Sequence, residues 1–184
     1  MLGGNYTVLN WLPTYLQTER HLSYSNTGLF LLVNIAGSFT GYILGGFVSD
    51  GLGRRHALKL FAVLGALSVF GYLMLGVSSL AILLLGFPLG FCQSAMNAGL
   101  GPLLSELFPT QLRATGQGIC YNAGRGIGAF FPALVGVLSG DVGLTSAIAV
   151  AAVAAYSVVL LCSFFLPETR DRALSSIDLA GNAQ

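Results

Sequence analysis

The sequence predicts an all-α membrane protein, a bundle of six transmembrane helices. Of its 184 residues, 54% are hydrophobic and only 8% are charged, whereas soluble domains carry roughly 25% charged residues. No Asp, Glu, Lys or Arg occurs in residues 21–49, 60–105 or 142–167, and each of these gaps has room for a crossing of about 20 residues. The apolar runs are continuous rather than alternating, which favours helices over the strands of a β-barrel.

Six spans are expected along the chain, and they make up a helical domain over residues 1–170. The expected spans are 2–16, 25–48, 57–76, 80–101, 114–139 and 143–166. The first is the weakest, because it is short and contains the polar Asn5 and Asn10 as well as Pro13. A chain that starts partway into a helix has this pattern, so we expect an upstream segment, and we expect a tail over residues 171–184.

The basic residues predict how the spans are oriented. Six crossings place the loops 50–59 and 102–113 and the tail on one side of the membrane, and Arg20 alone on the other. The basic residues of the first side are Arg54, Arg55, Lys59, Arg113, Arg170 and Arg172. Because loops rich in Lys and Arg stay in the cytoplasm, we expect a multi-pass protein of the plasma (inner) membrane with a cytoplasmic C-terminus.

Composition and motif content argue against several function classes. The net charge is only +1, so the sequence predicts no nucleic-acid partner. Cys92, Cys120 and Cys162 lie in expected spans without the spacing of metal ligands, which indicates simple packing. His21 and His56 sit beside charged loop residues, where neither could act as the base for a serine at membrane depth. We therefore expect no cofactor, no metal site and no enzyme activity.

Two segments on the basic side combine acidic, basic and glycine residues. In the segment 45–55, GGFVSDGLGRR, Asp50 stands where a helix leaves the membrane, and glycines then permit a tight reversal. Arg54 and Arg55 are expected to anchor the next helix at anionic headgroups. The segment 105–118 adds another acid and another arginine, so ion pairs are expected to latch helix ends in one state and release them in another. A solvated basic face with incidental pairs is the alternative. The expected gating network comprises Gly46, Asp50, Gly53, Arg54, Arg55, Glu106, Arg113, Glu168 and Arg170.

These motifs resemble those of the major facilitator superfamily. The pattern G-x-x-x-D-x-x-G-R-R is similar to the family's cytoplasmic loop signature between helices two and three, which recurs in weaker form between helices eight and nine. The matching positions are Gly46, Asp50, Gly53, Arg54 and Arg55. Gly51, where the strongest form has a basic residue, favours the second copy. Segment 105–118 is similar to the helix ten–eleven loop of the sugar and organic-acid branches, 11–16 to the end of helix seven, and PETR at 167–170 to the end of the second half.

The resemblance implies that the chain is the C-terminal six-helix half of a twelve-helix secondary transporter. Its partners would then be the lipid bilayer, an N-terminal six-helix half, a small-molecule substrate and a coupling ion, for which the proton is the family's common choice. The family uses such a charged network to hold the outward-facing form. Because this half has no buried carboxylate, any protonation site is expected in the other half or in the substrate.

Arg125 is the basic residue expected inside a span. It lies twelve positions after Arg113, which at 1.5 Å per residue places it about 18 Å deeper, near the middle of the bilayer. An arginine there costs about 2.5–3.5 kcal/mol, and the spans contain no acid to pair with it. Two interpretations stay open: Arg125 binds a substrate carboxylate, or it bridges to a group of the other half. The segment 121–125, Y-N-x-G-R, resembles the organic-acid branches.

Amide side chains share helix faces with this arginine or lie at similar depth. In lipid these groups need internal partners, so they are expected to face inward. The expected substrate-binding residues are Arg125, Asn122, Gln93, Asn97, Asn34, Asn10 and Tyr6. The predicted function is proton-coupled, alternating-access transport of a small organic anion, either a carboxylate or a sugar acid. Half of a sugar porter, a membrane protein that does not transport, and an intramembrane enzyme are the alternatives.

Glycines repeat at a spacing of four in three of the expected spans. The repeats are Gly37, Gly41 and Gly45, then Gly86 and Gly90, then Gly124 and Gly128. Small residues at this spacing allow helix backbones to approach closely in a membrane. Static packing is expected, and helix sliding during transport is the further option.

Overall fold

The computed structural model describes residues 1–74 and 78–166, and every regular element within them is a helix. The helices are α1 (Leu2–Thr18), α2 (Tyr24–Leu52), α3 (Arg54–Met74), α4 (Ser79–Ala98), α5 (Leu100–Leu107), α6 (Arg113–Val142) and α7 (Leu144–Phe165). The predicted fold class, an all-α membrane bundle, is confirmed. Glu168, Arg170 and the expected tail lie outside the described residues.

Five segments are long and apolar enough to cross a membrane, and α4 and α5 together form one of them. They are Tyr24–Leu52, Arg54–Leu73, Ser79–Leu107, Arg113–Val142 and Leu144–Phe165. In the region of the fourth expected span, 80–101, the helix breaks at Gly99 and helical structure continues to Leu107. At the break a Cβ on Gly99 would lie 2.9 Å from Ser49 Oγ, so α2 packs closely against this point.

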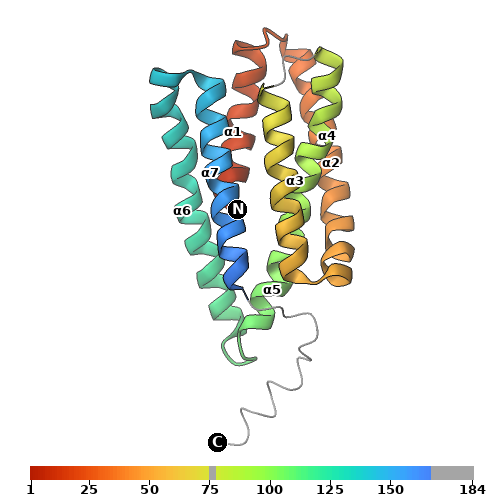
Figure 1. Ribbon diagram of the computed structural model, residues 1–184, viewed down its shortest axis with the longest axis vertical. Coiled ribbons are helices and arrows are strands. Elements are labelled where there is room, and N and C mark those ends of the chain that lie inside the picture. The colour runs from red at the N-terminus through yellow and green to blue at the C-terminus, as the bar shows by residue number, and fades with distance from the viewer. Residues whose placement is uncertain (75–77, 167–184) are drawn as a thin grey trace, which may run out of the picture.

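Successive long helices run in opposite directions, so the turns between them gather at two ends of the bundle (Figure 1). One end holds the α2–α3 turn, α5, the start of α6 and the end of α7. We call it the charged end, because Asp50, Arg54 and Glu106 lie there. The opposite end holds the end of α1 and the end of α3. We call it the tyrosine end, after Tyr15 and Tyr72.

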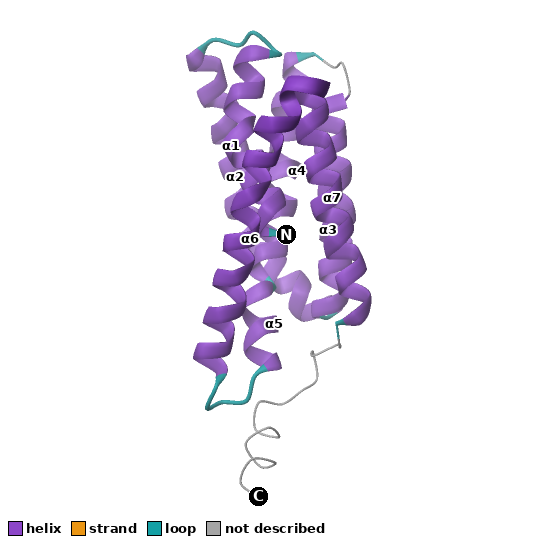
Figure 2. Ribbon diagram, turned by 90° about the vertical axis from the view of Figure 1, so that its left-hand side faces the viewer, coloured by secondary structure: helices purple, strands orange, loops and turns teal. Residues whose placement is uncertain are grey.

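The helices also divide between two sides of the bundle. Figure 2 shows α3 and α7 together on one side, while α1, α2 and α6 lie toward the other. Of the five membrane-crossing segments, α6 and α2 are the least buried. Large apolar side chains on them stay exposed, among them Phe39, Phe47, Ile127 and Phe130. The side that carries α2 and α6 is therefore an extended apolar surface that no other described part of the chain covers.

Glycines bring α2 and α4 into backbone contact. A Cβ at Gly37 or Gly41 would overlap the carbonyl oxygen of Phe87 or Phe91, and a Cβ at Gly90 would overlap a carbonyl oxygen of α2. No residue with a side chain fits at these positions unless the helices separate. The close packing predicted from the glycine spacing is confirmed for this pair of helices.

Asn34, one of the expected substrate-binding residues, lies inside this same contact. It is buried, and its Nδ2 donates a hydrogen bond of 3.2 Å to the carbonyl oxygen of Gly86 on α4. The lack of side chains on the facing glycines of α4 lets the amide reach the backbone of that helix. We therefore assign Asn34 to the packing of α2 on α4.

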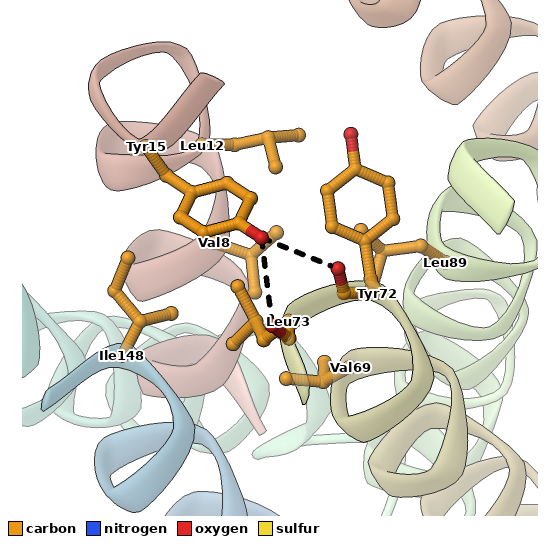
Figure 3. Close-up of a pocket in the computed structure, with 8 residues that line it drawn as sticks. All are labelled: Val8, Leu12, Tyr15, Val69, Tyr72, Leu73, Leu89 and Ile148. Atoms are coloured by element: carbon orange, nitrogen blue, oxygen red, sulfur yellow. Dashed lines mark hydrogen bonds between the residues drawn. The ribbon is translucent and has the colours of Figure 1, made fainter. Parts of the chain in front are cut away.

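Aromatic side chains hold α1 and α3 together at the tyrosine end. The Tyr15 hydroxyl lies 3.5 Å from the carbonyl oxygens of both Tyr72 and Leu73 at the end of α3 (Figure 3). It also accepts a 2.9 Å bond from Nε of Arg20. The Tyr15 and Tyr72 rings are tilted against each other with centroids 6.2 Å apart. Both residues border a small apolar cavity between α1, α3, α4 and α7. This contact ties α1 to the last carbonyls of α3.

Candidate functional site

Arg54 is the centre of the charged end. Its Nη2 and Nε lie 3.1 and 3.3 Å from Oε1 of Glu106, its Nη1 also pairs with Asp50, and it lies 3.3 Å from Ser49 Oγ. The local fold places it there because α2 ends at Gly53, whose φ of 93° suits glycine, and α3 begins at the next residue. One guanidinium therefore joins α2, α3 and α5.

The two acids of this cluster differ in their exposure. The Arg54 and Glu106 side chains are 13% and 15% exposed, whereas the Asp50 side chain is 64% exposed. An exposed pair contributes about 0–1 kcal/mol, and a sheltered pair is screened less by water and salt. Glu106 is therefore the stronger anchor for Arg54, and Asp50 holds it from the solvent side.

The other arginines of the expected gating network bind neutral oxygens. Arg55 donates 3.0 and 2.9 Å bonds to the carbonyl oxygens of Ser163 and Phe164 at the end of α7. Arg113 donates a 2.9 Å bond to the carbonyl oxygen of Ser105, so it fixes the α5–α6 loop. The expectation that these two arginines form ion pairs finds no support among the acids that the structure describes. Their function in the structure is to hold backbone carbonyls.

The remaining members of the expected network are the glycines Gly46 and Gly53. Gly53 ends α2, as described above, whereas Gly46 lies a turn before Asp50, and a Cβ added to it would meet no other atom within 4 Å. Gly46 therefore leaves open space beside α2. That space belongs to a hollow on the uncovered side of the bundle.

Arg125 lies close to the middle of α6, and its side chain is exposed on the uncovered side of the bundle. Its guanidinium carbon is 5.8 Å from the centre of the Tyr121 ring, a cation–π contact within α6. Within the described ranges it makes no ion pair. Asn122, on the same face, donates a 2.8 Å bond to the carbonyl oxygen of Gly118. The charge is thus aimed out of the bundle and stays without a counter-charge in the described residues.

Residues of α6 line three hollows in the described structure, and two of these hollows lie along the helix on either side of Arg125. The charged-end hollow, of about 730 Å³, is lined by Tyr42, Gly46, Asn97, Ala98, Leu100, Gly101, Leu104, Ala114, Gln117, Gly118 and Tyr121. The tyrosine-end hollow, of about 580 Å³, is lined by Tyr6, Asn10, Trp11, Thr14, Ala129, Pro132 and Ala133. Arg125 lies four residues from the nearest lining residue of α6 in each hollow, and steps of four keep one helix face. The two hollows and the arginine therefore form a continuous strip.

Three further residues of the expected substrate site border these hollows. Asn97 lines the charged-end hollow, and Tyr6 and Asn10 line the tyrosine-end hollow. The amide nitrogen of Asn97 donates to the carbonyl oxygen of Gln93, and that of Asn10 to the carbonyl oxygen of Tyr6. These bonds use only the nitrogen of each amide, so the side-chain oxygens remain available for a ligand.

Gln93, another expected substrate-binding residue, does not line either hollow. It is only 4% exposed and lies in the interior of the bundle, where its side chain meets the hydroxyl of Tyr156 on α7. Its Nε2 and the Tyr156 hydroxyl make no hydrogen bond of standard geometry within the described residues. An amide in a membrane needs an internal partner, and the Tyr156 hydroxyl of α7 is the polar group that lies beside Gln93.

The sequence interpretation missed four residues that line the hollows: Trp11, Tyr42, Gln117 and Tyr121. Gln117 and Tyr121 lie eight and four residues before Arg125, so the same helical spacing could have found them. Gln117 donates a 3.4 Å bond to the carbonyl oxygen of Gly101, which links α6 to α5. For Trp11 and Tyr42 no spacing signal was available, because their helices carry apolar residues on several faces.

The described residues offer few side chains for metal binding or thiol chemistry. Within the ranges that the structure covers, no three His, Cys, Asp or Glu side chains gather as metal ligands do. The cysteines are free, with Cys92 buried and Cys120 and Cys162 exposed. The expected packing role therefore fits the buried Cys92 but not the exposed Cys120 and Cys162.

The sequence profile of the Major Facilitator Superfamily matches residues 1–181. The chain belongs to this superfamily. No solved structure matches it with statistical significance. The bundle accordingly corresponds to half of a Major Facilitator Superfamily fold.

Several relatives within the Major Facilitator Superfamily are named for the organic acids that they carry. The chain is 37% identical over 174 residues to a protein of Cupriavidus pinatubonensis named "Probable 4-methylmuconolactone transporter", covering 95% of this chain and 40% of that protein. It is 32% identical over 143 residues to a cis,cis-muconate transport protein of Acinetobacter baylyi, covering 77% and 34%. It is 28% identical over 133 residues to a citrate-proton symporter of Klebsiella pneumoniae, covering 70% and 30%. The chain thus spans about 40% or less of the length of these relatives.

Proposed function

We propose that the chain forms the C-terminal six-helix half of a transporter that moves a small organic anion, a carboxylate or a sugar acid, by proton-coupled alternating access. The observation that carries the proposal is the position of Arg125 between two hollows on the uncovered side of the bundle. The protein would be a multi-pass protein of the plasma (inner) membrane, with its charged end and C-terminus in the cytoplasm. Transport, rather than catalysis, is its expected activity.

The charge of Arg125 supports an anionic substrate. An arginine in the middle of a membrane span faces a water-filled cavity or a counter-charge. Arg125 points away from its own bundle and meets only the Tyr121 ring among its described neighbours. A carboxylate held in the strip would supply the missing counter-charge through bidentate hydrogen bonds. A counter-charge from the companion half is the alternative.

The uncovered side of the bundle supports a companion half. Exposed apolar side chains on α2 and α6 frame the two hollows, and a second bundle packed there would convert the open strip into an enclosed passage. Transporters built from two repeats bind substrate near the bilayer midplane between them. The relatives, more than twice as long as this chain, have room for such a second bundle.

The charged end suits a latch for the alternating motion. Arg54 joins α2, α3 and α5 through one sheltered acid and one exposed acid, so its contacts are strong enough to hold and weak enough to open. Glu168 and Arg170 would add to this latch from beyond the end of α7. We assign Asp50, Arg54 and Glu106 to its core, with Arg55 and Arg113 supporting the helix ends around it.

Proton coupling rests on the named relatives rather than on a group in this chain. One relative is called a citrate-proton symporter, and the resemblance to the family also favours the proton. No carboxylate lies in the middle of the described helices; Asp50, Glu106 and Asp141 each lie within two residues of the end of a helix. The proton is therefore expected to bind in the companion half or on the substrate.

Uptake by the intact protein with Arg125→Gln and Arg125→Lys tests the proposal. We expect Arg125→Gln to lower uptake of labelled muconate and citrate by at least about tenfold through a weaker substrate affinity, since a lost charge partner costs about 2–5 kcal/mol. Arg125→Lys keeps the charge without the bidentate geometry and is expected to retain part of the uptake. Val137→Ala, at an exposed position of α6 that lines neither hollow, is the control for general damage to α6.

Thermal unfolding with and without substrate separates the two roles of Arg125. If the arginine binds substrate, Arg125→Gln keeps the unfolding temperature of the substrate-free protein and loses the stabilisation that substrate provides. A lower unfolding temperature without substrate, together with an unchanged substrate affinity, would assign Arg125 to a contact with the companion half. Intact anion uptake in Arg125→Gln would refute the substrate role.

A further inference from the structure

Arg54 and Arg55 are neighbours at the start of α3, but their side chains contact different parts of the structure. Arg54 faces the two acids of the charged end. Arg55 points to the end of α7, where it donates to the carbonyl oxygens of Ser163 and Phe164. Because carbonyls carry only partial negative charge, these bonds fix the orientation of the Arg55 side chain and leave its full positive charge unneutralised.

Lys59 lies one helical turn after Arg55 and faces the same way. Its Nζ is 4.1 Å from the centre of the Phe164 ring, a close cation–π contact. Residues four apart share a helix face, so Arg55 and Lys59 form a pair of cations beside the end of α7. Among the described residues, neither makes an ion pair.

The surroundings of this pair are apolar and exposed. Phe164 and Phe165 at the end of α7 are 59% and 87% exposed, and Leu161 one turn earlier is also exposed. The helices that carry this patch, α3 and α7, lie together on the side of the bundle away from α2 (Figure 2). Two unneutralised cations thus stand at the end of membrane-crossing helices, next to apolar surface that would face lipid tails.

We propose that Arg55 and Lys59 bind the phosphate of an anionic phospholipid, such as phosphatidylglycerol, whose acyl chains pack on Leu161, Phe164 and Phe165. Charge complementarity selects an anionic lipid, because a zwitterionic headgroup brings its own cation to a site that already holds two. The apolar patch selects a lipid over free phosphate, which would leave the phenylalanines without a partner. A bound lipid would cover the junction of α3 and α7 at the charged end.

Native mass spectrometry of the intact protein in detergent tests the site with phosphatidylglycerol and phosphatidylcholine as probes. We expect wild type to retain phosphatidylglycerol in preference to phosphatidylcholine. Lys59→Gln is expected to weaken phosphatidylglycerol binding about fivefold, and Arg55→Gln with Lys59→Gln by about 25-fold, since each basic residue near the headgroups contributes a similar increment. Inorganic phosphate at millimolar concentration is expected not to displace the lipid.

Two variants separate lipid binding from damage to the fold. Lys59→Gln removes the cation–π contact with Phe164 but leaves the two hydrogen bonds from Arg55 to α7 in place, so it can be measured even if the double variant is unstable. Arg113→Gln removes a cation from the same end of the bundle and is expected to leave phosphatidylglycerol binding unchanged. Equal retention of the two lipids by wild type, or equal phosphatidylglycerol binding by wild type and Lys59→Gln, would overturn the proposal. Displacement by inorganic phosphate would reassign the pair to a free anion. The result is independent of transport.

Discussion

The two ends of the bundle are held by different chemistry. At the charged end, one arginine joins three helices through two carboxylates, one of which is 64% exposed. At the tyrosine end, the buried rings of Tyr15 and Tyr72 pack together, and one hydroxyl meets the carbonyls that end α3. Ion pairs near solvent are weakened by water and salt, whereas buried aromatic packing is not. The contacts of the charged end are therefore more sensitive to water and salt than those of the tyrosine end, as the proposed latch requires.

This difference implies which contacts set stability and which set the rate of transport. Replacing a buried ring leaves a cavity that the bundle cannot fill, so the tyrosine end should respond in unfolding measurements. Replacing an exposed charge alters a contact that forms and breaks, so the charged end should respond in uptake. Three substitutions test this comparison.

Tyr15→Ala is expected to have the largest effect, at the tyrosine end. Removing a buried aromatic ring costs about 3–5 kcal/mol in well-packed cores, and the change also leaves the carbonyls of Tyr72 and Leu73 without their hydroxyl neighbour. We expect a marked fall in the temperature of thermal unfolding in detergent. Tyr24→Ala, which removes a tyrosine that is 83% exposed near the same end, serves as the control and should change that temperature little. Similar losses in both variants would contradict a special role for the tyrosine end.

Glu106→Gln is expected to have an intermediate effect, at the charged end. The change leaves the sheltered Arg54 guanidinium with a neutral partner, at a cost of about 1–3 kcal/mol. Because the contact also holds α5 against α3, we expect both slower uptake and a modest loss of stability. The exposed Glu19, at the other end of the bundle, offers a control as Glu19→Gln.

A double-mutant cycle identifies the source of the Glu106 effect. If Arg54 and Glu106 act as a pair, Arg54→Gln combined with Glu106→Gln costs less than the sum of the two single changes. If the effects of the two single changes are strictly additive, Glu106 acts without Arg54. The sheltered Arg54–Glu106 pair would then have no part in the proposed latch.

The sequence predicted features that depend on spacing along one helix or on the sum of charges. The break at Gly53 that lets α3 start, the pairing of Arg54 with acids, and the glycine contact of α2 with α4 all follow from local rules. The apolar spans were predictable for the same reason, since their length is set by the thickness of the bilayer.

Features that depend on which helix lies opposite were not predictable. Asn34 and Gln93 each need a partner in lipid, and the sequence could not say whether a substrate or a neighbouring helix supplies it. The structure gives Asn34 the carbonyl of Gly86 and places Gln93 against Tyr156. The sequence likewise could not distinguish Arg55 and Arg113, which bind backbone carbonyls, from Arg54, which binds acids. It does not show which backbone oxygens an arginine side chain will contact. The hollows were also not predictable, because residues from several helices line each of them.

Asp50→Asn is expected to have the smallest effect on stability and a clear effect on transport. The Asp50 side chain is 64% exposed and pairs with Arg54 one turn away on the next helix, and such pairs contribute about 0–1 kcal/mol. Membrane insertion and the unfolding temperature should therefore stay close to those of wild type. Uptake should be slower, because the solvent-side acid is the one whose contact with Arg54 is free to open and close while Glu106 holds on.

Salt provides the sharper version of this experiment. Screening weakens the exposed Asp50 pair more than the sheltered Glu106 pair, as the screening length falls from about 10 Å at 0.1 M to about 3 Å at 1 M. The difference in uptake between wild type and Asp50→Asn should therefore shrink as salt is raised, while the difference between wild type and Glu106→Gln persists. If Asp50→Asn takes up substrate as fast as wild type at low salt, the exposed acid has no part in the motion. The charged end would then be a static contact like the tyrosine end.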